Sequence, residues 1–166
     1  PIVLFGHSDG ASLALLLAAY FPARIAAVVA LAPHLFIEPV TVQGLQAARL
    51  AYQQGALKAG LARYHADTDS AFHGWNDAWL RPDFQQWNIE ADLQSLACPV
   101  LALQGLDDEY ATLAQIHAIQ RIHPPTRLCE LRDCGHAPQR DQPQAVIAAT
   151  LDLLASATPL LRTSPP

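Results

Sequence analysis

An apolar run, Ile2–Phe5, is separated by only five residues from a second run, Ala11–Tyr20, which is rich in alanine and leucine. The first run is short and continuous, which is typical of a parallel strand covered on both faces. The second run contains neither Gly nor Pro and ends before Pro22, which indicates a buried helix. A strand followed so closely by a helix is the first half of a βαβ crossover, so the sequence predicts a parallel sheet.

The same alternation of strand and helix continues along the chain. We expect further strands at Ile25–Leu31, Pro99–Gln104 and Thr126–Leu131, and helices at Thr112–Arg121 and Pro143–Leu154. This order predicts an α/β fold, a mostly parallel sheet with flanking helices. Residues 1–34 and 97–155 form this predicted core, and residues 156–166, which include three prolines, are expected to be a flexible tail.

Residues 35–96 interrupt the alternation and predict a run of short helices. These are expected at Val40–Gln54, Ala56–His65, Asp67–Leu80 and Ala91–Leu96, with Asp67 as a helix N-cap. A helical segment inserted after a strand suggests a lid over a site, and we interpret residues 35–96 as such a lid. Within it, Phe72, Trp75 and Trp79 are spaced as one helical stripe. This stripe either packs the lid onto the core or contacts a substrate.

Composition excludes several classes of protein. With 166 residues, 51% of them hydrophobic and 15% charged, the chain is long and apolar enough for one globular domain and is not disordered. The net charge of −5 argues against a nucleic-acid-binding protein, and no apolar run is long enough to span a membrane. Three cysteines give no disulfide framework and fit a reducing compartment, so we expect a cytoplasmic protein.

The five residues between the first strand and helix read Gly6-His7-Ser8-Asp9-Gly10, a G-x-S-x-G pattern. In a strand-to-helix turn this pattern is typical of a nucleophile elbow, in which a strained turn exposes the serine hydroxyl. The glycines are expected because the chain passes close to its neighbours there. Ser8 is therefore the predicted nucleophile, and the backbone N–H of Asp9 is a predicted oxyanion donor. The alternative is a tight turn with an incidental serine.

A serine nucleophile needs a base, and seven histidines compete for that role. His136 follows the last predicted strand and precedes the last helix, so it can reach the carboxyl edge of the sheet. We therefore predict His136 as the base, with His7 and His34 as candidate pocket residues beside Trp75 and Trp79.

The partner acid is expected in the turn after the third strand. Three neighbouring carboxylates could reach the base, and their spacing does not choose among Asp107, Asp108 and Glu109. Asp133 is a weaker candidate because it is so near His136 in the sequence. Tyr110 and Glu109, beside this turn, could reach the pocket, but we expect them to have surface roles.

Together these segments resemble the α/β-hydrolase family, over essentially the whole chain. The resemblance is carried by Gly6–Gly10, by Pro99–Asp108 and by Gly135-His136-Ala137-Pro138, in the chain order Ser, Asp, His. The family pattern places the acid three residues after the glycine that closes the strand, which selects Asp108. The family also has strands before the elbow and an early loop with a second oxyanion donor. Neither is present, so we expect an N-terminally truncated chain whose first strand leaves an apolar edge exposed.

The resemblance implies a serine hydrolase that cleaves a carboxylic ester or lactone through Ser8, His136 and Asp108. Basic residues are sparse in the predicted lid, so we expect a small-molecule substrate with an apolar portion and no multiple charge. No metal or other cofactor is expected, since the cysteines lack metal-ligand spacing. The alternatives are cleavage of a carbon–carbon bond, perhydrolysis, and a non-catalytic ligand-binding module.

Overall fold

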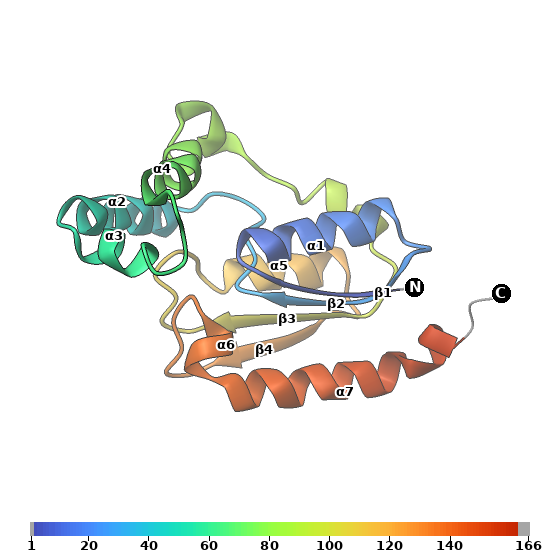
Figure 1. Cartoon of the computed structure of the whole chain (residues 1–166). Helices are drawn as coiled ribbons and strands as arrows, with labels where there is room; N and C mark the ends of the chain where they lie inside the picture. Colours follow the sequence, from blue (N-terminus) through green and yellow to red (C-terminus); the bar gives the residue numbers. More distant parts are fainter. Residues whose placement is uncertain (1, 163–166) are drawn as a thin grey trace.

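A computed structural model describes residues 2–162, with side chains as far as residue 157, and contains one parallel sheet (Figure 1). Its four strands lie side by side in chain order. They are β1 (Ile2–His7), β2 (Ile25–Leu31), β3 (Val100–Gly105) and β4 (Arg127–Leu131). Because all pairs are parallel, the carboxyl ends of the strands meet at one edge of the sheet. The predicted α/β fold is confirmed.

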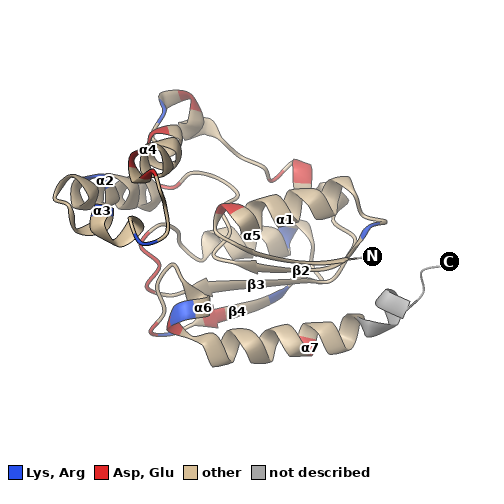
Figure 2. Ribbon diagram, in the orientation of Figure 1, with Lys and Arg blue, Asp and Glu red and all other residues tan. Residues whose placement is uncertain are grey.

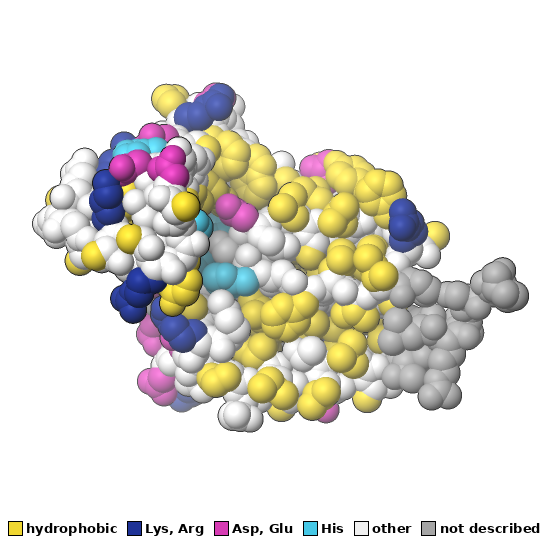
Figure 3. Space-filling view, in the orientation of Figure 1, with side chains coloured by type: hydrophobic (Ala, Val, Ile, Leu, Met, Phe, Trp, Pro, Cys, Tyr) yellow, Lys and Arg dark blue, Asp and Glu magenta, His cyan; other side chains and the backbone are white. Residues whose placement is uncertain are grey.

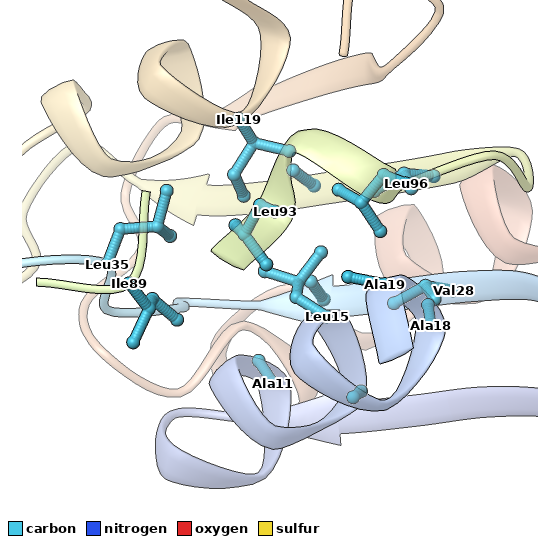
Figure 4. Close-up of a cluster of buried hydrophobic side chains, with 14 of the residues drawn as sticks. Ala11, Leu15, Ala18, Ala19, Val28, Leu35, Ile89, Leu93, Leu96 and Ile119 are labelled. Atoms are coloured by element: carbon cyan, nitrogen blue, oxygen red, sulfur yellow. The ribbon is translucent and has the colours of Figure 1, made fainter. Parts of the chain in front are cut away.

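Helices cover both faces of the sheet. Figure 1 shows α1 (Asp9–Tyr20) and α5 (Ala114–Ile122) on one face and α7 (Pro143–Arg162) on the other. Every residue of β2 is buried because helices cover both faces. Side chains alternate between the faces of a strand, and all residues of β2 except Ala26 belong to one of two separate cores. Figure 4 shows the first core, where Leu15 of α1, Val28 of β2 and Ile119 of α5 pack together.

The predicted elements have nearly the observed bounds, with two exceptions. The helix predicted at Ala56–His65 ends at Leu61. Helix α7 continues to Arg162 instead of ending at Leu154, so residues 156–162 are helical where the sequence predicted a flexible tail. The cause is packing, because Ala157 lies one turn beyond Leu153 and both are buried in the core beneath the sheet. The rest of the predicted tail, residues 163–166, lies outside the described residues.

Between β2 and β3 the chain forms the helices α2 (Pro39–Gln53), α3 (Ala56–Leu61) and α4 (Thr68–Trp79), followed by the short 3₁₀ helices η1 (Pro82–Gln86) and η2 (Asp92–Ser95). We refer to α2–α4 as the helical segment. It lies beyond the carboxyl edge of the strands (Figure 1). As predicted, the Asp67 side chain caps α4 by accepting a hydrogen bond from the backbone of Ser70. Helices η1 and α6 (Pro138–Asp141) were not predicted.

The helical segment has a small core of its own. The rings of Tyr52 and Phe72 stack with centroids 3.9 Å apart, and Ala48 is buried with them. By contrast, Leu35 and Leu93, at the two ends of residues 35–96, are buried in the core above the sheet. The packing therefore separates α2–α4 from the segments that connect them to the sheet.

Strand β1 lies at the edge of the sheet and exposes apolar side chains. Ile2 and Phe5 are 57% and 55% exposed. Figure 3 shows hydrophobic side chains gathered on this face, where Leu17 of α1 and Leu151 of α7 are also exposed. Charged residues are few on β1–β3 and lie mainly in loops and in the helical segment (Figure 2). Within residues 2–162, no helix is both long enough and apolar enough to cross a membrane.

Candidate active site

Ser8 lies in the sharp turn between β1 and α1. Its backbone has φ 55° and ψ −122°, a conformation that non-glycine residues seldom adopt and that costs roughly 1–3 kcal/mol. Hydrogen bonds hold the turn, because Ser8 N donates to Leu31 O at 2.9 Å and Ala11 N donates to Ser8 O at 2.9 Å. The strained turn places the serine side chain at the carboxyl edge of the sheet, next to the N-terminus of α1.

Only one of the two glycines in the Ser8 turn is required by a close contact. A Cβ on Gly6 would overlap the backbone of Gly10 and would lie 2.7 Å from Ala11 N. A Cβ on Gly10 would meet no atom within 4 Å, so the expectation that both glycines avoid a clash is wrong for Gly10. Of these two glycines, only Gly6 lies where strand β1 and helix α1 approach each other closely.

The acid turn after β3 and the histidine loop after β4 also meet backbone to backbone. A Cβ on Gly105 would overlap the carbonyl groups of Cys134 and Gly135. Asp107 N donates to Cys134 O at 3.0 Å, and Leu106 N donates to Leu131 O at 2.8 Å. The absence of a side chain at residue 105 thus allows the two loops to lie against each other.

The close backbone contacts at Gly6 and at Gly105 bring Ser8, His136 and Asp108 into one hydrogen-bonded chain. The Ser8 hydroxyl donates to His136 Nε2 at 2.9 Å, and His136 Nδ1 lies 2.9 Å from both carboxylate oxygens of Asp108. Because a carboxylate only accepts hydrogen bonds, Nδ1 carries the ring proton and leaves Nε2 free to accept. A neutral imidazole in this tautomer is ready to take a proton from the hydroxyl.

Asp108 differs from its acidic neighbours in burial and in partners. Its side chain is fully buried, and it accepts hydrogen bonds from the Gln104 amide and, at 2.8 Å, from Tyr110 N. Asp107 and Glu109 are exposed. Glu109 does not contact the imidazole; it accepts a hydrogen bond from the backbone N–H of His136 at 3.2 Å. Asp133 is also exposed and lies outside the hydrogen-bonded chain.

His7 supports the histidine loop from the other side. Its Nε2 donates to His136 O at 2.6 Å. Burial is the largest influence on the pKa of His7 and lowers it, although the hydrogen bond to His136 O acts in the opposite direction. His7 was predicted to be a pocket residue. In the structure its ring contacts the loop backbone and does not line the pocket described next.

A narrow pocket opens at the Ser8 hydroxyl, between the edge of the sheet and the helical segment. The space left between its side chains is about 10 Å³, enough for one water-sized group. The lining residues are Ser8, Asp9, His34, Thr41, Leu45, Trp75, Trp79, Tyr110 and His136. Of the predicted pocket residues, His34, Trp75 and Trp79 are therefore in this lining.

Two lining residues were not predicted, and a third was assigned to the surface. Thr41 and Leu45 come from one face of α2, and no local pattern marks them. Tyr110 was expected at the surface, yet its ring centroid lies 4.8 Å from that of His136. Its proximity to Asp108 in the sequence was a sign that Tyr110 could lie in the pocket. A turn, however, can direct such a side chain either into the pocket or toward the surface.

Asp9 connects the Ser8 turn to the helical segment. Its carboxylate accepts a hydrogen bond from Trp79 Nε1 at 3.3 Å, and burial raises its pKa. Its backbone N–H belongs to the first turn of α1, where amides have no partner within the helix. That end of α1 favours negative charge beside Ser8.

The remaining candidates for unusual chemistry lie outside the pocket. Cys134 is 1% exposed, and burial, with smaller contributions from nearby carboxylates, raises its thiol pKa to about 11. Within residues 2–162 no group of three or more histidine, cysteine, aspartate or glutamate side chains is arranged to hold a metal ion.

A model of the alpha/beta hydrolase family matches residues 1–149, so the chain belongs to this family. Among curated proteins, no sequence matches it. Solved structures share its fold at low sequence identity.

A carboxylesterase structure from the thaumarchaeon Nitrososphaera gargenis has a TM-score of 0.71 at 18% identity, over 94% of this chain and 65% of its own. A thermophilic esterase from Thermogutta terrifontis has a TM-score of 0.61 at 20% identity, over 94% of this chain and 65% of its own. For the enol-lactonase from Burkholderia xenovorans LB400 the values are 0.63 and 21%, over 91% of this chain and 64% of its own. The chain thus spans slightly less than two thirds of each of these proteins.

Proposed function

We propose that the protein is a serine hydrolase that cleaves a carboxylic ester or lactone through an acyl-enzyme. The observation that carries the proposal is the hydrogen-bonded chain from the Ser8 hydroxyl through His136 to the buried Asp108. A serine hydroxyl is a weak nucleophile until an adjacent base accepts its proton, and this arrangement supplies that base and an acid that orients it.

In the proposed first half-reaction, Ser8 Oγ attacks the carbonyl carbon while His136 Nε2 takes the hydroxyl proton. Asp108 stabilises the resulting imidazolium, and the Asp9 backbone N–H donates to the oxyanion that forms. The imidazolium then gives its proton to the leaving alkoxide, and the ester bond breaks. In the second half-reaction His136 removes a proton from water, the hydroxide oxygen attacks the acyl group, and Ser8 recovers its proton.

The lining of the pocket supports an uncharged substrate with an apolar portion. Trp75, Trp79 and Leu45 are apolar, and the nine lining residues include no lysine or arginine that could bind a carboxylate or phosphate. We further propose that residues 35–96 act as the lid of this pocket.

The proposed partner is a small molecule, with no role for a nucleic acid or a membrane. The three cysteines Cys98, Cys129 and Cys134 are free thiols, which supports a cytoplasmic location.

Labelling of the purified protein with a fluorophosphonate tests the proposal, because the reagent forms a bond only with an activated serine. We expect labelling in the wild type and none in Ser8→Ala. His136→Ala and Asp108→Asn should slow labelling by at least about a hundredfold, because each removes one member of the unit that activates Ser8.

Asp107→Asn is the matched control for Asp108→Asn, since the neighbouring carboxylate is exposed and does not contact the imidazole. This variant should leave the labelling rate within about twofold of the wild type, because the Asp107 side chain is exposed and contacts neither Ser8 nor the imidazole. Labelling that survives removal of the His136 ring would contradict the proposed mechanism. A protein that is not labelled at all would favour a ligand-binding module.

A further inference from the structure

His34 is brought into the pocket by a strained turn directly after β2. Ala32, the residue that follows the strand, has φ 46°, and its N–H donates to Leu103 O at 2.8 Å. A positive φ on a residue with a side chain persists only where the surrounding structure holds it in place. The turn leads the chain out of the sheet, and His34 lines the pocket together with Ser8 and His136.

The backbone of His34 is held on both sides. The Ser12 hydroxyl donates to His34 O at 2.7 Å and accepts from His34 N at 3.1 Å. The next residue, Leu35, donates its N–H to the buried amide oxygen of Gln115 at 2.7 Å. The imidazole is therefore presented from a fixed backbone, as a preorganised binding residue would be.

The imidazole of His34 is buried, and a weak interaction with the Tyr110 carbonyl falls outside ordinary hydrogen-bond geometry. The residue is 3% exposed, and neither Nδ1 nor Nε2 is paired within the described part of the chain. The ring packs edge-on against Trp79, with centroids 5.0 Å apart, and lies 5.5 Å from the ring of His136. An unpaired buried polar group costs about 1–3 kcal/mol. Such a cost at a pocket wall points to a partner that arrives with a ligand.

The charge state of His34 follows from its surroundings. Burial lowers its pKa to about 4, and His136 lowers it further, while Asp108, the Tyr110 carbonyl and Glu38 raise it by less. The ring is therefore neutral near pH 7 and offers one donor and one acceptor. The pocket is also lined by the carboxylate of Asp9 and by no lysine or arginine. A negatively charged ligand group would therefore meet no positive partner there.

We propose that His34 determines specificity by hydrogen-bonding an uncharged oxygen of the substrate, an ether, hydroxyl or second carbonyl, close to the scissile ester. The proposal rests on the hydrolase function proposed above. It assigns as substrates those esters and lactones that carry such an oxygen on a short group, since the pocket beside Ser8 has room for only a small group. An ester with a methylene group at that place would leave His34 unpaired and would be hydrolysed less efficiently.

Two pairs of esters of equal length test this role. On the acyl side, 4-nitrophenyl methoxyacetate is compared with 4-nitrophenyl butyrate; on the alcohol side, 2-methoxyethyl acetate is compared with butyl acetate. In each pair an oxygen replaces a methylene group. The ratio of the two kcat/KM values is measured for the wild type and for variants, so that the intrinsic reactivities of the esters cancel. The pair that responds identifies the side of the ester that carries the recognised oxygen.

His34→Phe keeps an aromatic ring against Trp79 but removes both nitrogens, whereas His34→Gln keeps a donor and an acceptor. We expect His34→Phe to lower the oxygen-to-methylene ratio about tenfold in one pair, the effect of losing one hydrogen bond. His34→Gln should restore most of it. His117→Phe is the matched control: its ring is hydrogen-bonded to Glu130 and does not line the pocket, so the ratio should not change.

The outcomes separate this proposal from the proposed function. If the fluorophosphonate labels Ser8 in His34→Phe at the wild-type rate and both ester ratios stay unchanged, the specificity role of His34 is wrong while the hydrolase function stands. An equal loss of kcat/KM for both members of each pair would also overturn it, since that is the result of a purely structural role. If Ser8→Ala still hydrolyses the esters, the proposed function itself is wrong.

Discussion

The edge of the sheet around Ser8 and the helical segment α2–α4 face each other across the pocket, but they are held in different ways. At the edge of the sheet the loops are fixed by backbone contacts, and Ser8, Ala32 and Asp133 all have positive φ. In the helical segment the contacts are between side chains, as in the stacked rings of Tyr52 and Phe72. Backbone contacts thus hold Ser8 and His136 in place, and side-chain packing holds the opposite wall of the pocket.

The largest effect is expected from Gly105→Ala, which tests the backbone side of this comparison. The new Cβ would overlap the carbonyl groups of Cys134 and Gly135, and backbone cannot move aside as a side chain can. We expect a loss of about 3 kcal/mol or more in the free energy of unfolding. Displacement of His136 from Ser8 should slow fluorophosphonate labelling at least about a hundredfold. Urea unfolding and labelling rates measure the two effects.

Gly74→Ala is the control for Gly105→Ala from the helical segment. A Cβ on Gly74, in the middle of α4, would meet no atom within 4 Å. Alanine at an exposed helical position should stabilise the protein by about 0.5–1 kcal/mol and leave labelling unchanged. If the two alanine variants behaved alike, the distinction between the two regions would fail.

A smaller effect is expected from pH, through His34, which lies where the two regions meet. Its pKa is about 4 in the folded protein, against 6.5 for a free histidine. Between these values the unfolded chain binds a proton that the folded protein does not. The free energy of unfolding should therefore be highest above pH 6.5 and fall by about 3 kcal/mol as the pH drops to 4.

Chemical unfolding of the wild type and of His34→Phe across this pH range measures the contribution of His34. The variant should show a shallower dependence on pH. Some dependence should persist, because burial also lowers the pKa of His7 and of His123. Identical curves for the two proteins would mean that His34 titrates normally in the folded state.

The smallest of the three destabilising effects is expected from Asn76→Ala, which tests the side-chain contacts of the helical segment. Asn76 is fully buried; it donates to Leu45 O at 2.9 Å and accepts from Arg49 Nε at 2.8 Å. Its removal leaves the Leu45 carbonyl unpaired, at a cost of about 2 kcal/mol. Hydrogen exchange should accelerate in α2 and α4 while β2 and β3 stay protected. Acceleration throughout the sheet would contradict independent packing of the helical segment.

The sequence predicted best what depends on local patterns. Strand β2 has the predicted bounds, Ile25–Leu31, because a short apolar run that contains β-branched residues and ends before a proline is typical of a strand buried on both faces. The motif around Ser8 also predicted the turn between β1 and α1 correctly. Gly6 is required by its contact with Gly10, which is only four residues away.

What the sequence could not predict depends on contacts between distant segments. Spacing left Asp107, Asp108 and Glu109 equivalent, and the choice came from the family resemblance, because only the tertiary contact with His136 distinguishes them. Tyr110 was assigned to the surface for the same reason. Helix α7 was predicted too short because Ala157 is buried by contact with the core beneath the sheet, which the residues next to it in the sequence do not indicate.

Cys134 lies two residues before His136, but its burial and its pKa of about 11 keep it a thiol in neutral solution. At pH 7 only about one molecule in ten thousand would carry the thiolate there, and the thiolate is the reactive form of cysteine. Iodoacetamide and peroxide should therefore leave this sulfur unmodified. Phosphorus reagents that prefer oxygen can then report on Ser8 without a competing reaction a few residues from the imidazole.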